Sequence, residues 1–190
     1  MTGQKDYTYL TDEALIVLMQ HGDNRVFDEI YKRYGQKIFR YFFKMLWQDK
    51  DRAEDFTQDL FVKLIKNKTG YDATRNFATW LFSIAHNMCK NEYRKQEVRV
   101  KFNKMKEATN TIQAHNPDLA RFSTALQQCT DALQPQKKEL YFLRIIENYT
   151  IPQIAAIMDI PEGTVKSRIF NLLKEMRENL KQFEGLLTYP

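Results

Sequence analysis

Few residues of this 190-residue chain could carry covalent or metal chemistry. The chain contains three histidines and two cysteines, and only His86 and Cys89 are spaced to share one side of a helix. A structural zinc site takes about four ligands, and the sequence offers no convincing others near this pair. It also lacks a glycine-rich phosphate-binding loop, a G-x-S-x-G nucleophile motif and a kinase signature. We therefore predict no metal site, no cofactor and no enzymatic activity.

Positive charge is the clearest chemical feature of the sequence. The formal net charge is +5 and the pI is about 9.1, a balance that favours an anionic partner. The segment from Lys90 to Lys106 holds seven basic residues against Glu92 and Glu97, an excess as large as that of the whole chain. The polar helical face that leads into it consists of Thr79, Ser83, His86, Asn87, Lys90, Asn91 and Arg94. Such a face suits sugar, phosphate and base edges, although most faces of this composition are simply solvated.

Aromatic residues surround the start of this polar face, namely Tyr71, Phe77, Trp80 and Phe82. Aromatic rings beside cations suit the unstacked bases of nucleic acid. Some of these rings must belong to the hydrophobic core, and Trp80 fits either place. Charge and aromatic rings together favour contact with DNA more than either feature does alone.

An acidic segment precedes the aromatic residues. Its carboxylates are Asp49, Asp51, Glu54, Asp55 and Asp59, against Lys50 and Arg52. Carboxylates at the start of a helix often serve only its dipole and its solvation. This segment would repel DNA, but an exposed face at Gln58 and Asp59 could dock a basic helical partner.

The elements that position these residues are predicted to be helices. All five prolines follow residue 116 and β-hairpin signals are absent, so residues 1–116 can form long helices. Apolar residues recur three or four apart, which predicts helices over 10–19 (entered through Thr11 and Asp12), 26–46, 51–66 and 74–95. In the second helix the predicted inward residues are Phe27, Ile30, Tyr31, Tyr34, Ile38, Phe42, Met45 and Leu46. In the third helix they are Phe56, Leu60, Phe61, Leu64 and Ile65.

A polar stretch separates two sets of helices. Residues 98–118 lose the helical period, although part of this stretch could be helical, and we interpret them as a flexible basic linker. Further helices are predicted over 119–133, 136–147, 151–158 and 162–183, the third of them with a capping box formed by Thr150 and Gln153. The predicted fold class is all-α, with two small helical domains at residues 1–97 and 119–190.

The last two predicted helices have the spacing of a helix-turn-helix. On the final helix, Val165, Ile169, Leu172 and Met176 fall within one narrow sector and form its core side. Ser167, Phe170, Asn171 and Lys174 point the other way, with Lys166 and Arg168 on the flanks. A plain helical hairpin would rarely expose Phe170 amid polar neighbours, whereas polar side chains with an apolar edge suit the major groove. This pattern favours DNA binding by the second helix of the pair.

No apolar run approaches the roughly 20 residues of a membrane-spanning helix, and the start of the sequence is polar. We expect a cytoplasmic protein in which Cys89 and Cys129 are reduced.

Four segments together resemble bacterial sigma factors of the extracytoplasmic-function (ECF) group of the sigma-70 family. They are "HGDNRVFDEIYKRYGQKIFRYF", "AEDFTQDLFVKLI", "FATWLFSIAHNMCKNEYRK" and "LRIIENYTIPQIAAIMDIPEGTVKSRIFNLLKEMRENL", in the order and spacing of the family. The resemblance implies that residues 1–97 form a region-2 domain that binds core RNA polymerase and opens the minus-ten element. It also implies that residues 119–190 form a region-4 domain that recognises the minus-thirty-five element.

The resemblance further implies roles for individual residues. The implied minus-ten contacts are Tyr71, Phe77, Trp80, His86, Asn87, Lys90, Asn91 and Arg94, with the loop over 71–77 capturing an everted base. The implied minus-thirty-five contacts are Thr164, Lys166, Ser167, Arg168, Phe170 and Asn171. The implied polymerase contacts are Asp55, Gln58, Asp59 and Phe61. The expected partners are core RNA polymerase, promoter DNA and a membrane-anchored anti-sigma factor, and the free protein is expected to be a monomer.

Two other classes of function remain open from the sequence. An ordinary DNA-binding regulator would use the final domain as its only DNA-binding element and would footprint duplex DNA without polymerase. A helical interaction protein would have no nucleic-acid role, and Ser167→Glu with Phe170→Ala would leave its function intact.

Overall fold

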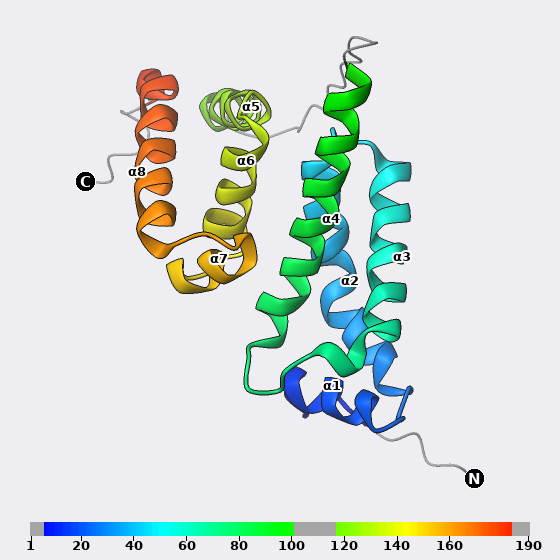
Figure 1. Ribbon diagram of the computed structural model, residues 1–190. Helices are drawn as coiled ribbons and strands as arrows, with labels where there is room; N and C mark the ends of the chain where they lie inside the picture. The colour runs from blue at the N-terminus through cyan, green and yellow to red at the C-terminus, as the bar shows by residue number, and fades with distance from the viewer. Residues whose placement is uncertain (1–5, 101–116, 184–190) are drawn as a thin grey trace. The chain divides into compact units, whose positions relative to one another are not determined.

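The computed structural model describes residues 6–100 and 117–183 (Figure 1). Within those ranges every regular element is a helix. The helices form two compact units, one with α1–α4 and one with most of the helical residues from α5 onward. The predicted all-α fold with two helical domains is therefore confirmed. No described helix is long and apolar enough to cross a membrane.

Three long helices lie side by side in the first unit, and a short helix closes one end of the bundle (Figure 1). The long helices are α2 (Val26–Met45), α3 (Lys50–Lys66) and α4 (Phe77–Val100), and the short one is α1 (Asp12–Gln20). The core between them includes Ile30, Ile38, Tyr41, Phe42, Leu60, Leu64, Leu81, Phe82 and Ala85. Large apolar side chains that lose their water here provide the main stabilisation of the bundle.

Polar side chains fix the beginnings of these helices. The Thr11 hydroxyl accepts a hydrogen bond from the Ala14 amide (3.2 Å), as predicted for the start of α1. Asp49 caps α3 by accepting from the Arg52 amide (3.1 Å). Arg33 of α2 holds the entry to α1, because its guanidinium donates to the Leu10 carbonyl (2.9 Å) and to the Asp12 carboxylate (2.8 Å).

Three details differ from the sequence-based expectations for the first unit. Helix α4 begins at Phe77 rather than at residue 74, because Asn76 caps it by accepting from the Thr79 amide (2.9 Å). It continues to Val100, so residues 98–100 of the predicted linker are helical. Tyr31 and Ile65, predicted to point inward, are 48% and 42% exposed because they lie at the edges of their apolar stripes. The remainder of the predicted linker to residue 116 lies outside the described residues.

The second unit contains α5 (Pro117–Asp131), α6 (Pro135–Tyr141), α7 (Ile151–Met158) and α8 (Glu162–Asn179), with a short 3₁₀ turn at Lys181–Phe183. The helix predicted over 136–147 is α6 followed by one π-helical turn, Phe142–Ile146. In that turn the Glu147 amide donates to the Phe142 carbonyl (2.9 Å), and Asn148 then ends the helix at a positive φ of 56°. The core of the unit includes Leu140, Leu143, Ile154, Val165 and Leu172.

Candidate promoter and polymerase interfaces

The helix-turn-helix in the second unit is built by local hydrogen bonds. The predicted capping box is confirmed: the Thr150 amide donates to the Gln153 side-chain oxygen (2.9 Å), and the Gln153 amide donates back to the Thr150 hydroxyl (3.4 Å). Asp159 takes a positive φ of 54° in the turn, and the Ile160 amide closes it on the Ala155 carbonyl (3.2 Å). Pro161 takes the N-cap position of α8 without a side-chain hydrogen bond. These interactions fix where α8 begins relative to α7.

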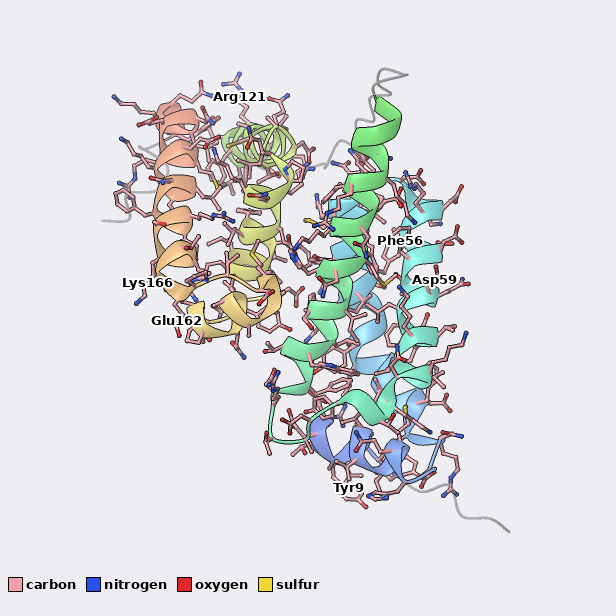
Figure 2. All side chains as sticks on the ribbon, viewed as in Figure 1. Tyr9, Phe56, Asp59, Arg121, Glu162 and Lys166 are labelled. Atoms are coloured by element: carbon pink, nitrogen blue, oxygen red, sulfur yellow. The ribbon has the colours of Figure 1, made fainter. Side chains whose placement is uncertain are left out.

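Helix α8 separates a core side from an exposed side. Val165, Leu172 and Met176 are buried as predicted, whereas Ile169 is only half-buried. Phe170 is 69% exposed, and Lys166, Ser167 and Asn171 are also exposed. Lys166 projects away from the helix bundle into solvent (Figure 2). An ion pair between Lys137 of α6 and Glu175 of α8 joins these two helices.

The remaining predicted minus-thirty-five residues are less accessible. Thr164 and Arg168 are half-buried. The Ser167 hydroxyl donates to the Thr164 carbonyl (3.1 Å), so its oxygen stays available as an acceptor. Leu173, which the sequence analysis did not single out, is 45% exposed next to this face. In the sequence, only the position of Leu173 between the core stripe and Phe170 indicates that its side chain could be exposed.

Helix α4 presents a second polar face. Asn87, Lys90, Asn91 and Arg94 are exposed at helical spacing along it, and Trp80 and His86 are half-buried. The structure therefore brings these six of the eight predicted minus-ten residues to the surface of one helix or its margin. Amide donors and cations along one helix can contact both base edges and phosphates.

The other two predicted minus-ten residues serve the core in this conformation. Tyr71 is 4% exposed and Phe77 is fully buried. The Phe77 ring packs against Tyr34 (5.4 Å between centroids) and Tyr71 (5.7 Å), and the Tyr71 ring packs against Trp80 (5.0 Å). Burial raises the pKa of Tyr71 to about 12, and the nearby Glu13 carboxylate adds to this effect. The side chains of Tyr71 and Phe77 therefore offer DNA almost no surface in this conformation.

Helix α3 carries the predicted polymerase contacts. Asp55, Gln58 and Asp59 are exposed on one face, and Figure 2 shows Asp59 pointing to solvent. Phe61 is 3% exposed and packs against the rings of Phe27 (5.9 Å) and Tyr31 (4.8 Å), so it supports this face rather than forming part of it.

Apolar residues that the sequence analysis did not propose extend the α3 face. Val62, one turn beyond Gln58 and Asp59, is 45% exposed, and Ile65 follows in the next turn. The sequence signal was that the apolar residues of α3 spread over more of its circumference than one core stripe needs. The face therefore combines carboxylates in its first half with apolar side chains in its second half.

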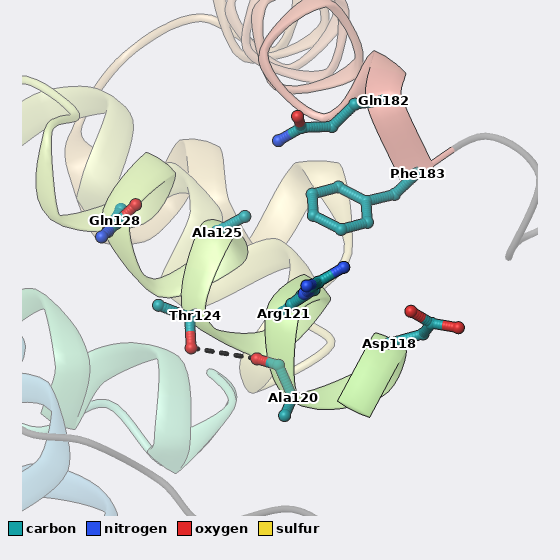
Figure 3. A pocket seen from close by; sticks show the side chains of 8 residues that line it. All are labelled: Asp118, Ala120, Arg121, Thr124, Ala125, Gln128, Gln182 and Phe183. Atoms are coloured by element: carbon teal, nitrogen blue, oxygen red, sulfur yellow. Dashed lines mark hydrogen bonds between the residues drawn. The ribbon is translucent and has the colours of Figure 1, made fainter. Parts of the chain in front are cut away.

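Away from these faces, the described residues could still offer a metal site, a disulfide or a pocket. Among the described residues, no three His, Cys, Asp or Glu side chains are placed to hold a metal ion, and Cys89 and Cys129 form no disulfide. An open hollow in the second unit is lined by Asp118, Ala120, Arg121, Thr124, Ala125, Gln128, Gln182 and Phe183 (Figure 3). None of the predicted site residues lines it.

The fold is that of a two-unit helical protein whose second unit carries a helix-turn-helix, a motif typical of DNA-binding proteins. Residues 30–99 match the model of Sigma-70 region 2, and residues 123–176 match that of Sigma-70 region 4. The chain is 30% identical over 182 residues to the ECF RNA polymerase sigma-E factor of Haemophilus influenzae, covering 90% of this chain and 95% of that protein. It is 26% identical over 175 residues to the ECF RNA polymerase sigma factor SigW of Bacillus subtilis, covering 86% and 93%.

The fold also resembles a solved sigma factor. The structure of RpoE from Bartonella quintana in complex with the anti-sigma factor NepR matches with a TM-score of 0.66 and 24% identity, covering 82% of this chain and 96% of that chain. The chain belongs to the ECF group of the sigma-70 family, whose members are transcription initiation factors.

Proposed function

We propose that this protein binds core RNA polymerase in the cytoplasm, directs it to a subset of promoters, and is restrained by an anti-sigma factor. The observation that carries the proposal is the exposed polar face on one helix of each unit, within the segments that match regions 2 and 4. The protein has no catalytic role of its own in this proposal.

We assign promoter contacts to the exposed faces of α4 and α8. On α4, Asn87, Lys90, Asn91 and Arg94 contact the minus-ten element, with Trp80 and His86 at the margin. On α8, Lys166, Ser167, Phe170 and Asn171 contact the minus-thirty-five element, flanked by Thr164 and Arg168. We assign residues 1–97 and 119–190 as the two functional domains and residues 98–118 as the connection between them, with helical residues at both of its ends. Two weak contacts that polymerase holds in register can together discriminate a promoter that neither domain binds tightly alone.

We assign polymerase docking to α3, through Asp55, Gln58 and Asp59 together with the exposed Val62. A carboxylate-rich surface favours association with a basic helical partner, and apolar side chains beside it slow dissociation once the surfaces meet. Phe61 supports the face from below because its ring is packed against α2.

Run-off transcription with purified core polymerase and genomic promoter fragments tests the proposal. We expect the protein to bind core polymerase and to stimulate transcription from a subset of fragments. Absence of both core binding and stimulation would refute the proposal. A footprint on duplex DNA by the protein alone, without stimulation, would instead identify an ordinary DNA-binding regulator.

The proposed anti-sigma factor is tested separately. The similar RpoE structure is described as a complex with an anti-sigma factor, which supports an equivalent partner for this chain. A tagged version recovered from uninduced native cells should carry a second protein besides polymerase subunits. Recovery of polymerase alone would contradict this part of the proposal and leave the initiation role intact.

A further inference from the structure

The loop between α3 and α4, residues 67–76, is held by a side chain from α1. The Gln20 amide nitrogen donates to the carbonyl oxygens of both Lys68 (2.8 Å) and Tyr71 (2.9 Å). These carbonyls lie 48 and 51 positions later in the chain, at the first residue of the 3₁₀ turn Lys68–Gly70 and at the residue directly after it. One amide group therefore fixes the entry to the loop from a different helix.

A second side chain of α1 fixes the exit of the loop. Glu13 accepts a hydrogen bond from the backbone amide of Phe77 (3.0 Å), the first residue of α4. This amide has no partner inside its own helix, because the first amides of any helix lack a preceding carbonyl. Glu13 thus joins the end of the loop to α1, as Gln20 joins its beginning.

The part of the loop between these anchors is exposed to solvent. Asp72, Ala73, Thr74, Arg75 and Asn76 are all exposed. Asp72 accepts from both the amide (3.0 Å) and the hydroxyl (2.8 Å) of Thr74, which fixes a tight turn. On the buried side of the loop, the Tyr71 hydroxyl donates to the Arg75 carbonyl. Hydrogen bonds therefore hold the backbone of residues 72–76 although these residues are exposed.

We propose that Gln20 and Glu13 are positioning residues that preorganise loop 67–76 to bind an unpaired base of the non-template promoter strand. The inference rests on the proposed function and adds α1 to the machinery of promoter opening. Neither residue touches DNA. They act by keeping the loop in its competent conformation, since affinity falls in proportion to the fraction of molecules in that conformation. A loop that had to order itself on each encounter would bind the extruded base more weakly.

The central test replaces Gln20 by methionine, which preserves the length of the side chain and removes both donors. Gln36→Met is the matched control, because Gln36 is an exposed residue of α2. In the free protein, amide hydrogens of residues 67–77 should exchange about tenfold faster in Gln20→Met, with exchange in α5–α8 unchanged. In the holoenzyme, permanganate reactivity at the minus-ten element of a responsive promoter should fall about tenfold, with affinity for core polymerase unchanged.

Glu13 supplies a rescue test. Glu13→Leu removes the acceptor and should reduce promoter opening, whereas Glu13→Gln keeps an oxygen for the Phe77 amide and should restore it. Faster exchange in the loop with normal promoter opening would overturn the inference, because the two residues would then be merely structural. Normal exchange in Gln20→Met would overturn it as well. Failure of the wild-type protein to stimulate transcription would instead refute the proposed function, and the inference with it.

Discussion

Arg52 of α3 and Glu92 of α4 form an ion pair, although Glu92 lies almost fully inside the bundle. The Arg52 guanidinium also lies over the ring of Trp47 (5.4 Å), which in turn contacts Tyr93 (5.5 Å). The Arg52 side chain therefore contacts α4 and Trp47 and does not form part of the exposed carboxylate face of α3. A buried carboxylate needs such a partner, because an unpaired charge there is costly.

Removal of the Arg52 charge should destabilise the first unit. We expect Arg52→Met to lower its free energy of unfolding by about 1–3 kcal/mol, because Glu92 would be left buried without its partner. Lys50→Met, which breaks the exposed pair with Glu54 (3.6 Å), should change it by about 0.5 kcal/mol or less. Both tryptophans, Trp47 and Trp80, lie in the first unit, so urea denaturation followed by tryptophan fluorescence measures it directly. Equal effects of the two variants would contradict the prediction.

Charge reversal on α3 should separate polymerase docking from general electrostatics. Asp59→Lys is expected to weaken binding to core polymerase about tenfold or more, because a cation within the proposed face would repel a basic partner. Asp28→Lys makes the same charge change at an exposed position of α2, outside α3. Titration of core polymerase with a fluorescently labelled protein compares the two variants. Equal losses would indicate a long-range charge effect and exclude docking through this face.

The exposed face of α8 should matter for promoter use and not for folding. We expect Phe170→Ala to leave the melting temperature almost unchanged, since the ring is mostly exposed, and to lower transcription from a responsive promoter about tenfold. Leu172→Ala, on the buried side of the same helix, should instead lower stability by about 2–5 kcal/mol. Calorimetry and run-off transcription measure the two effects. Full transcription by Ser167→Glu combined with Phe170→Ala would refute DNA contact by this face.

Burial of Tyr71 predicts a loss of stability at alkaline pH. Its pKa is raised from 10.0 to about 12 in the folded protein. Between these two pH values the folded state retains a proton that the unfolded state has released. The stabilising effect is complete below pH 10 and is lost as pH rises towards 12, because the unfolded state then binds fewer protons. Tyr71→Phe should reduce the slope of unfolding free energy against pH in this range. Tyr9→Phe, at an exposed position, is the matched control, and an unchanged slope in Tyr71→Phe would contradict the prediction.

The features that depend on local geometry can be predicted from the amino-acid sequence alone. The core and exposed sides of α8 follow from the helical period, and Val165, Leu172 and Phe170 lie where that period places them. The capping box of Thr150 and Gln153 spans one turn and needs no distant partner. The two helical domains follow from the positions of the helix breakers and the polar stretch between them.

Which residues at the edge of an apolar stripe are buried depends on how neighbouring helices pack against them. Phe61 and Ile65 both border the core stripe of α3, yet Phe61 is buried by rings from α2 while Ile65 remains exposed. Phe77 is likewise buried because its ring packs against Tyr34 of α2. The bonds from Gln20 to a loop some fifty residues later have no counterpart in periodicity or local spacing. Only the packing of α1 across the end of the bundle brings that side chain to the loop, because contacts between distant segments depend on how whole helices pack.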